Sequence, residues 1–320
     1  MKVIYCRPFN VANNNYIEIH KEIWKSLGFK VKSIRTINFK TLFYRKNNIA
    51  VINWLEDSIV DSNNGRVSFF LFTRRFFLLM LLRIMCGKLI WVQHNYVPHS
   101  LKGDDTLPYF KAFCKLIYLV SDVKVSHAPT DNEFKGVVID HPLYPKAVNQ
   151  DNITLNNDFL IIGAVTEYKQ IDKLLLDWPS EFKLHIAGKC DSSILEKNIK
   201  EVISSRKLNV TWDKRFLSHE EVELYLRSSK VVIIPHKEDS MIVSGAFYHG
   251  ISNGCSILMR DSSFYKYVST WFKHVDSFNS ENIKNKCQLS LNDYNQKEVL
   301  LSAHKHCSDS KLAKMWNEIL

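Results

Sequence analysis

Short apolar runs alternate along this chain with longer stretches in which apolar residues recur at helical spacing. The runs are rich in valine and isoleucine, which is typical of strands buried on both faces of a parallel sheet. They predict strands at 2–5, 49–54, 89–92, 123–126, 137–145, 159–163, 182–188, 209–212 and 231–234. Helices are predicted at 16–28, 66–87, 109–120, 171–178, 192–204, 218–229 and in the segment after 298. This alternation predicts an α/β fold.

The stretch from Val231 to Leu258 combines a strand, a polar loop, a helix and a second strand. Ser244 stands at the N-cap of the predicted helix, Gly245 begins its first turn, and Gly254 follows its end. Backbone N–H groups of the first turn lack partners within the helix, and a glycine lets an anion approach them closely. The stretch therefore predicts a diphosphate site. The alternative is an ordinary crossover in which Ser244 is only a cap.

Size and charge add two expectations. The chain has 320 residues, 46% of them apolar, and exceeds the usual size of one compact domain, so two domains are expected. Residues 1–150 contain 21 Lys and Arg against 11 Asp and Glu, whereas residues 151–320 contain 22 of each kind. A basic first half favours an anionic partner such as a membrane surface, a phosphorylated acceptor or nucleic acid; the alternative is a solvated basic surface. The seven cysteines include no CxxC pair, so neither a disulfide framework nor a zinc site is indicated.

Residues 66–87 are the most apolar segment, yet they contain Arg74, Arg75 and Arg83. Each arginine at the centre of a bilayer costs about 2.5–3.5 kcal/mol on insertion scales, so this helix is not expected to span a membrane. It either lies at a membrane interface or packs in the core with its arginines extended to solvent. The first residues form a strand and an Asn-rich turn rather than a signal peptide. We therefore expect a cytoplasmic protein, peripheral on the inner face of the plasma membrane if the helix contacts lipid.

The loop after the strand at 89–92 contains His94, Asn95 and His99. Histidine titrates near neutral pH, so this loop is the main candidate for acid–base chemistry, with a structural histidine as the alternative. The two histidines have no third suitable ligand nearby, which argues against a metal site.

A second polar loop follows the first strand. No GxGxxG motif occurs there, so a dinucleotide fingerprint is absent. Asn13 and Asn14 in this loop are instead expected to line an acceptor site. Glu56 follows the strand at 49–54, at the edge where open α/β sheets bind ligands, and is assigned to the same acceptor side.

Five segments carry a family resemblance: WVQHNYVPHS, DHPLYP, GAVTEYKQIDKLL, KLHIAG and PHKEDSMIVSGAF. Together they resemble glycosyltransferases of the GT-B fold, similar to family 4 and its relatives that build bacterial surface polysaccharides. The resemblance implies two Rossmann-like domains facing a central cleft. Residues 1–147 would form the acceptor domain, 148–302 the nucleotide-sugar domain, and 303–320 a C-terminal helix docked on a domain surface.

The resemblance also implies roles for single residues. Lys169 matches the family's phosphate-binding lysine, and the donor diphosphate site would comprise Lys169, Ser244, Gly245 and His236. The nucleotide base and ribose would contact Arg215, Phe216 and Gly188, and catalysis would involve His94, Asn95, His99 and Glu238. Two departures stand out, because Ala164 replaces the family's diphosphate-binding arginine, and Met241 and His249 replace its glutamate pair. Glu238 or Asp239 is then the substitute for the first glutamate.

The expected activity is transfer of a sugar from a UDP- or GDP-linked donor to a hydroxyl of a saccharide in surface polysaccharide biosynthesis, with a lipid-linked saccharide as the preferred acceptor. No DxD motif occurs in the chain, so no divalent cation and no cofactor beyond the co-substrate are expected. Two alternatives stay open. One is a nucleotide-sugar epimerase or hydrolase that needs no lipid acceptor. The other is a basic nucleic-acid-binding protein, although no recognition helix or interleaved basic and aromatic patch is present, and nucleic acid is not an expected partner.

Overall fold

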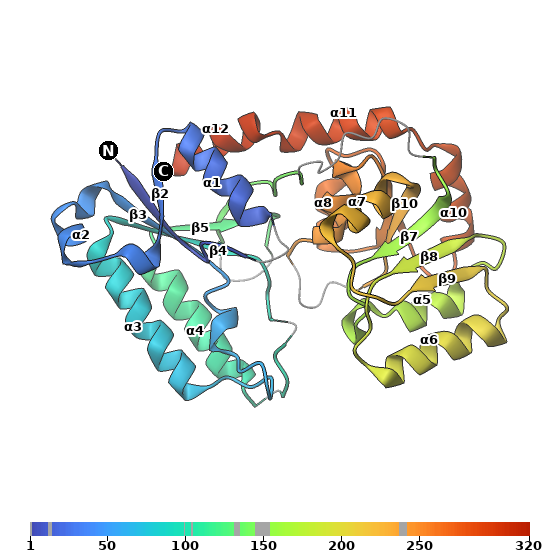
Figure 1. Cartoon of the computed structure of the whole chain (residues 1–320), viewed down its shortest axis with the longest axis horizontal. Coiled ribbons are helices and arrows are strands. Elements are labelled where there is room, and N and C mark those ends of the chain that lie inside the picture. The colour runs from blue at the N-terminus through green and yellow to red at the C-terminus, as the bar shows by residue number, and fades with distance from the viewer. Residues whose placement is uncertain are drawn as a thin grey trace. The chain divides into compact units, whose positions relative to one another are not determined.

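A computed structural model describes residues 2–11, 15–98, 100–103, 105–130, 135–144, 154–236 and 242–320. The described residues form two compact units, each built around a six-stranded sheet (Figure 1). The first unit runs to Pro142 and includes Asp309–Leu320, and the second comprises Leu143–Glu238 and Ser244–Ser308. The predicted α/β class is confirmed.

The first sheet is entirely parallel, with the order β2-β1-β3-β4-β5-β6. Its strands are β1 (Val3–Arg7), β2 (Lys30–Ser33), β3 (Asn48–Asn53), β4 (Lys88–Gln93), β5 (Val123–Ser126) and β6 (Val137–Val138). The strand predicted at 137–145 is thus much shorter than expected. It is an edge strand that pairs only with β5, and Pro142 beyond it has no N–H to extend a ladder.

Alternate residues of the first sheet face different helices. Tyr5 and Ile52 belong to a core shared with α3 (Phe69–Met85) and α4 (Leu107–Val120). Ile4 and Val51 point to the opposite face, where α1 (Tyr16–Ser26) and α12 (Asp309–Ile319) cover the sheet. The rings of Trp24 on α1 and Trp316 on α12 meet edge to face at 5.2 Å between centroids. The end of the chain is therefore part of the first unit's core.

The second sheet is also parallel, with the order β12-β11-β10-β7-β8-β9. Its strands are β7 (Asn157–Ile162), β8 (Leu184–Ala187), β9 (Val210–Asp213), β10 (Ser229–Ile234), β11 (Ser256–Arg260) and β12 (Val275–Phe278). One face packs on α5 (Ile171–Asp177), α6 (Ser193–Ser205) and α10 (Ile283–Asn292). On the other face lies α8 (Gly245–Ser252), where Gly250 allows close contact with Val232 and Ile257.

The remaining helices are α2 (Phe39–Phe43), α7 (His219–Arg227), α9 (Ser263–Val268) and α11 (Gln296–Cys307). A capping box begins α7, since the Ser218 hydroxyl accepts from Glu221 N–H and the Glu221 carboxylate accepts from Ser218 N–H. The expected division between residues 302 and 303 falls inside α11, a continuous helix.

The strand order positions the sites. It reverses direction between β1 and β3 in the first sheet and between β7 and β10 in the second. In open parallel sheets the loops at the carboxyl ends of such strands diverge and leave a crevice that binds ligands. The loops after β1, β3, β7 and β10 are therefore the places where function is expected.

Candidate donor and acceptor sites

The loop after β7 positions the amino group of Lys169. The chain turns at Gly163, whose φ of 91° suits glycine, and Lys169 ends the 3-10 helix η4 (Glu167–Lys169). The Lys169 Nζ donates to the carbonyl of Ile162 at 3.3 Å, and no carboxylate pairs with it within the described ranges. Burial lowers the pKa of Lys169 to about 8. A half-buried cation that pairs with no described carboxylate at this edge is suited to hold an anion.

Two further backbone features shape this loop. Gln170 adopts the left-handed conformation, with φ of 52°, between η4 and α5. Such strain in a residue other than glycine is often found at functional sites. Gly188, at the end of β8, lies so close to Gly163 that a Cβ on it would be 2.3 Å from the Gly163 oxygen. Gly188 therefore brings the ends of β7 and β8 together, and its predicted contact with the nucleotide stays a prediction.

The N-terminus of α8 lies at the same edge of the sheet, after β10. Ser244 is buried at the N-cap with an extended backbone, but its hydroxyl makes no capping hydrogen bond. A Cβ built on Gly245 would meet no atom of the described residues within 4 Å, so none of them fills the space beside this first turn. His236 follows β10, and its ring lies 5.8 Å from that of Tyr168 in the Lys169 loop. The loops after β7 and β10 thus meet, and Glu238 is outside the described residues.

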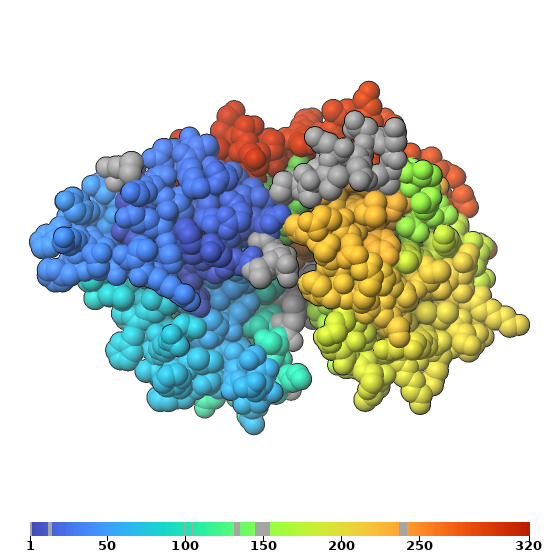
Figure 2. Space-filling view, viewed as in Figure 1, coloured from blue at the N-terminus to red at the C-terminus, as the bar shows by residue number. Residues whose placement is uncertain are grey.

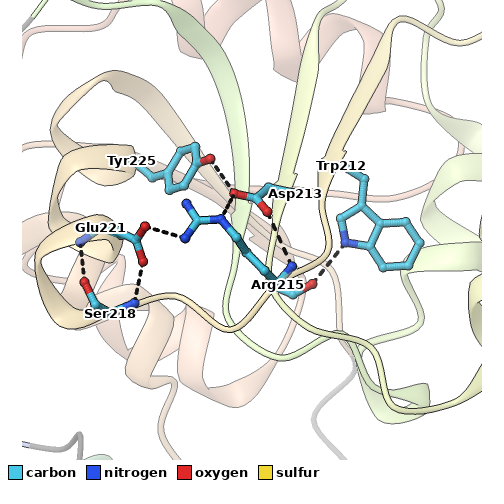
Figure 3. Close-up of polar contacts among 7 residues, drawn as sticks. Trp212, Asp213, Arg215, Ser218, Glu221 and Tyr225 are labelled. Carbon is cyan, nitrogen blue, oxygen red and sulfur yellow. Dashed lines mark hydrogen bonds and ion pairs between the residues drawn. The ribbon is translucent and has the colours of Figure 1, made fainter.

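Arg215 is held by two carboxylates in the loop after β9 (Figure 3). Its Nε donates to Asp213 at 3.0 Å, and its Nη1 is paired with Glu221 of the α7 capping box. The Tyr225 hydroxyl donates to the same Asp213 carboxylate at 2.8 Å. The guanidinium therefore organises the loop, whereas Phe216 beside it is 66% exposed and presents a free ring. Both assignments to the nucleotide base stay predictions.

His94 follows β4 in the first unit and is buried. Its Nε2 lies 3.0 Å from Asn53 Oδ1, and the Asn53 amide nitrogen donates to the carbonyl of Arg7 at 3.4 Å. This orientation of the amide assigns the proton of His94 to Nε2 and leaves the lone pair on Nδ1. Trp54 stacks on the imidazole at 4.1 Å with a φ of 49°, a second strained residue at a site loop. Burial raises the pKa of Asp57 to about 6, and a hydrogen bond with the side chain of the half-buried Asn95 opposes that rise. His99 lies outside the described residues.

His94 is one of several histidines that surround Tyr16, an arrangement that the sequence did not predict. The Tyr16 hydroxyl lies 2.7 Å from His127 Nε2, while His127 Nδ1 donates to the carbonyl of Ile139. Burial lowers the pKa of His20 to about 3 and of His127 to about 4, and lowers that of His94 well below 6.5. These rings are therefore neutral at pH 7. In the parts of the chain that the structure describes, no group of three or more His, Cys, Asp or Glu could hold a metal ion.

Glu56 is fully buried, which argues against direct contact with an acceptor. Its Oε2 accepts from the indole N–H of Trp91 at 2.9 Å. Burial, reinforced by the adjacent Asp57, raises the pKa of Glu56 to about 8. Glu56 is thus a buried, mostly protonated acid at neutral pH. Asn13 and Asn14, assigned to the same acceptor side, lie outside the described residues.

Comparison with solved structures identifies the fold. No protein-family model and no curated protein matches the chain. Among solved structures, Anabaena Alr3699/HepE in complex with UDP and glucose is 10% identical, with a TM-score of 0.60 over 100% of this chain and 99% of that one. AviGT4, a glycosyltransferase involved in avilamycin A biosynthesis, is 11% identical, with a TM-score of 0.57 over 100% and 96%.

The chain has the GT-B fold. A third similar structure is the pneumococcal O-GlcNAc transferase GtfA with UDP and GlcNAc, 11% identical with a TM-score of 0.52, of which the match covers 57%. At these identities the comparisons establish architecture alone. The GT-B sheets of this chain place Lys169 and the start of α8 at one strand-order reversal and His94 one strand away from the other.

Proposed function

We propose that this protein is a glycosyltransferase that moves a sugar from a nucleotide diphosphate sugar to a hydroxyl of a saccharide acceptor. The observation that carries the proposal is Lys169, a half-buried cation that pairs with no carboxylate of the described residues and lies at the same sheet edge as the first turn of α8. Three structures of this fold support it: AviGT4 is a glycosyltransferase, GtfA is an O-GlcNAc transferase in complex with UDP and GlcNAc, and Alr3699/HepE is in complex with UDP and glucose. The donor would bind the second unit and the acceptor the first.

The donor site must stabilise the negative charge that develops on the leaving diphosphate. Breaking the bond between the anomeric carbon and the diphosphate leaves negative charge on the leaving group. Lys169 and the backbone N–H groups at Gly245 would bind that charge as it develops, and they are fixed in place before the reaction. Ala164 in place of an arginine leaves Lys169 as the cation of this loop, so its removal should affect the reaction strongly. The proposed reaction needs no metal ion.

On the acceptor side, His94 is the proposed catalytic histidine. Its neutral ring carries a lone pair on Nδ1, and Asn53 holds the proton on Nε2. A neutral imidazole of this tautomer can accept the proton of an acceptor hydroxyl or orient the hydroxyl by a hydrogen bond. Asn53 is then a positioning residue, because it determines which nitrogen faces the substrate.

The first unit also exposes an apolar and basic face on α2 and α3, which we define by Phe39, Phe43, Phe69, Phe70, Phe77, Ile84, Lys40, Arg45, Lys46 and Arg74. The phenylalanines are 64–84% exposed, and of the 17 residues of α3 only Leu79 and Leu82 are buried. The blue and cyan segments of these helices form part of the surface in Figure 2. One side of α3 thus packs in the core through Leu79 and Leu82, and the rest of the helix is exposed or half-buried. No described helix is long and apolar enough to cross a membrane.

Aromatic side chains interspersed with Lys and Arg suit the interface of an anionic membrane. We therefore propose that the α2–α3 face contacts such a membrane and that the acceptor is lipid-linked, as in the assembly of surface polysaccharides. This places the protein on the cytoplasmic surface of the plasma membrane.

Donor use tests the main proposal. Purified protein is incubated with a panel of UDP- and GDP-linked sugars, and release of the nucleotide diphosphate is measured with and without added saccharide acceptors. One donor should support release that depends on Lys169 and rises with an acceptor. Release without any transfer product, whatever the acceptor, would favour a nucleotide-sugar hydrolase, and no turnover of any donor by the folded protein would contradict the proposal.

Vesicle flotation tests the membrane contact. The triple variant Phe69→Ser, Phe70→Ser and Phe77→Ser should float with phosphatidylglycerol vesicles at least about tenfold less than the unchanged protein. Its matched control replaces equally exposed apolar side chains of the second unit, Ile194, Phe216 and Leu301, with serine. Equal flotation of both triple variants would refute the assignment of this face.

A further inference from the structure

A pocket of about 480 Å³ opens at the strand-order reversal of the first sheet. It is formed where β1, β2 and β3 end, and its lining includes Arg7, Pro8, Ile34, Arg35, Asn53 and Trp54. Two of these residues are arginines, and none is acidic. The volume exceeds what a single ion needs and suits a small organic ligand.

The positive charge of this pocket is not neutralised. In the described part of the chain, the guanidinium groups of Arg7 and Arg35 make no ion pair and no hydrogen bond. Burial, together with the positive charges of Arg75, Arg74 and Arg35, lowers the pKa of Arg7 to about 10. Glu56 is the acid that favours the charged form of Arg7, but its own raised pKa of about 8 leaves it mostly protonated at pH 7.

The walls of the pocket are held in place by the fold. The Lys21 amino group on α1 donates to the carbonyl of Phe9 at 3.1 Å and lies 4.2 Å from the centre of its ring. The Asn53 amide donates to the carbonyl of Arg7, which ties the end of β1 to the end of β3. A partly buried, unpaired guanidinium costs folding free energy, and an anion that binds it recovers that cost.

We propose that this pocket binds a phosphate group carried by the acceptor, held by Arg7 and Arg35. Guanidinium groups donate two parallel N–H bonds to phosphate oxygens, and two arginines match a dianionic phosphate better than a single carboxylate. Binding of the phosphate stands on the pocket alone, whereas its role as part of the acceptor rests on the proposed function. The phosphate belongs either to a soluble sugar phosphate or to a phosphorylated lipid, and the same guanidinium contacts serve both.

Calorimetric titration without a donor tests the pocket directly. The ligands are glucose 6-phosphate, farnesyl phosphate in detergent, UDP, and glucose as the neutral control. Arg7→Gln and Arg35→Gln should each weaken binding of a phosphorylated compound by about tenfold or more. The double variant Lys111→Gln and Lys115→Gln removes two exposed charges of α4 in the same unit and should leave this binding unchanged.

The outcomes distinguish the proposed phosphate pocket from the proposed donor site. Arginine variants that lose the phosphorylated compound but still bind UDP, together with Lys169→Met showing the reverse, support separate acceptor and donor sites. Preference for farnesyl phosphate identifies a lipid source, and preference for glucose 6-phosphate a soluble one. Equal weakening by the Lys111 and Lys115 control would show general charge attraction and overturn the pocket. Unchanged binding in correctly folded Arg35→Gln, whose side chain is exposed, would overturn it as well.

Discussion

Replacing Lys169 with methionine should make the protein more stable and less able to bind a nucleotide diphosphate. The pKa of Lys169 falls from 10.5 to about 8, which corresponds to about 3 kcal/mol of unfavourable burial of its charge. Methionine keeps a similar length without charge. At pH 7 the Lys169→Met variant should therefore gain up to about 3 kcal/mol in the free energy of unfolding.

The stability gained by Lys169→Met should depend on pH. Because the folded-state pKa of Lys169 lies below the unfolded value, the unfolded chain binds more protons between about pH 8 and 10.5. The cost is complete below about pH 8 and disappears as the pH rises towards 10.5. The stability difference between Lys169→Met and the unchanged protein should accordingly shrink over that range. Urea unfolding at pH 7, 8.5 and 10 measures it.

Binding of UDP should change in the opposite direction. A hydrogen bond to a charged group contributes about 1.5–3 kcal/mol, so Lys169→Met should weaken UDP by about ten- to a hundredfold. The control is Lys173→Met, which removes an exposed charge from the adjacent helix α5. A Lys169→Met variant that is destabilised at pH 7, or that binds UDP as tightly as Lys173→Met does, would refute the reasoning.

Three further predictions concern stability. His20 and His127 have folded-state pKa values of about 3 and 4, below their unfolded value of 6.5. Each histidine should therefore lower the free energy of unfolding by about 2 kcal/mol as the pH falls from 8 to 5, which urea unfolding measures. A free energy of unfolding that does not change with pH over this range would contradict the neutral state of the two rings. Gly188→Ala should cost about 2–4 kcal/mol because its Cβ would overlap Gly163, whereas Gly245→Ala should change stability little, and thermal melts compare the pair. Trp316→Ala should cost about 3–5 kcal/mol by removing a fully buried ring from the first unit; a change below 1 kcal/mol would contradict that packing.

The sequence predicted most strands and helices because their patterns are local. Buried runs such as Ile49–Asn53 and the capping box at Ser218 depend on residues a few positions apart. The strand β2 (Lys30–Ser33) was missed because its sequence KVKS alternates charge with a single apolar residue, as suits a partly exposed edge strand. The Lys169 loop was predicted by resemblance, and its burial could not have been read from the sequence.

The first unit's polar core was not predictable because it depends on tertiary contacts. His20, His94 and His127 come from three separate elements, and each looks in sequence like an isolated histidine. Glu56 follows a strand and resembles an exposed loop residue. Its burial depends on Trp91, 35 positions later, whose N–H supplies the partner that the carboxyl needs. Side-chain burial at a strand end is decided by the neighbouring strand, which no local pattern reveals.

Lys169 and Arg7 have similar surroundings in the two sheets. Each lies near the carboxyl end of a strand that borders a strand-order reversal, is shielded from water, and lacks a carboxylate partner among the described residues. A fold that needed only stability would pair or remove such charges, because burial of an unpaired cation is costly. Their retention at equivalent places of two sheets is what a protein that holds anionic groups in both domains requires. If the proposed phosphate site is correct, part of the excess positive charge of residues 1–150 serves binding, because Arg7 and Arg35 line the pocket and the charges of Arg74 and Arg75 act on Arg7.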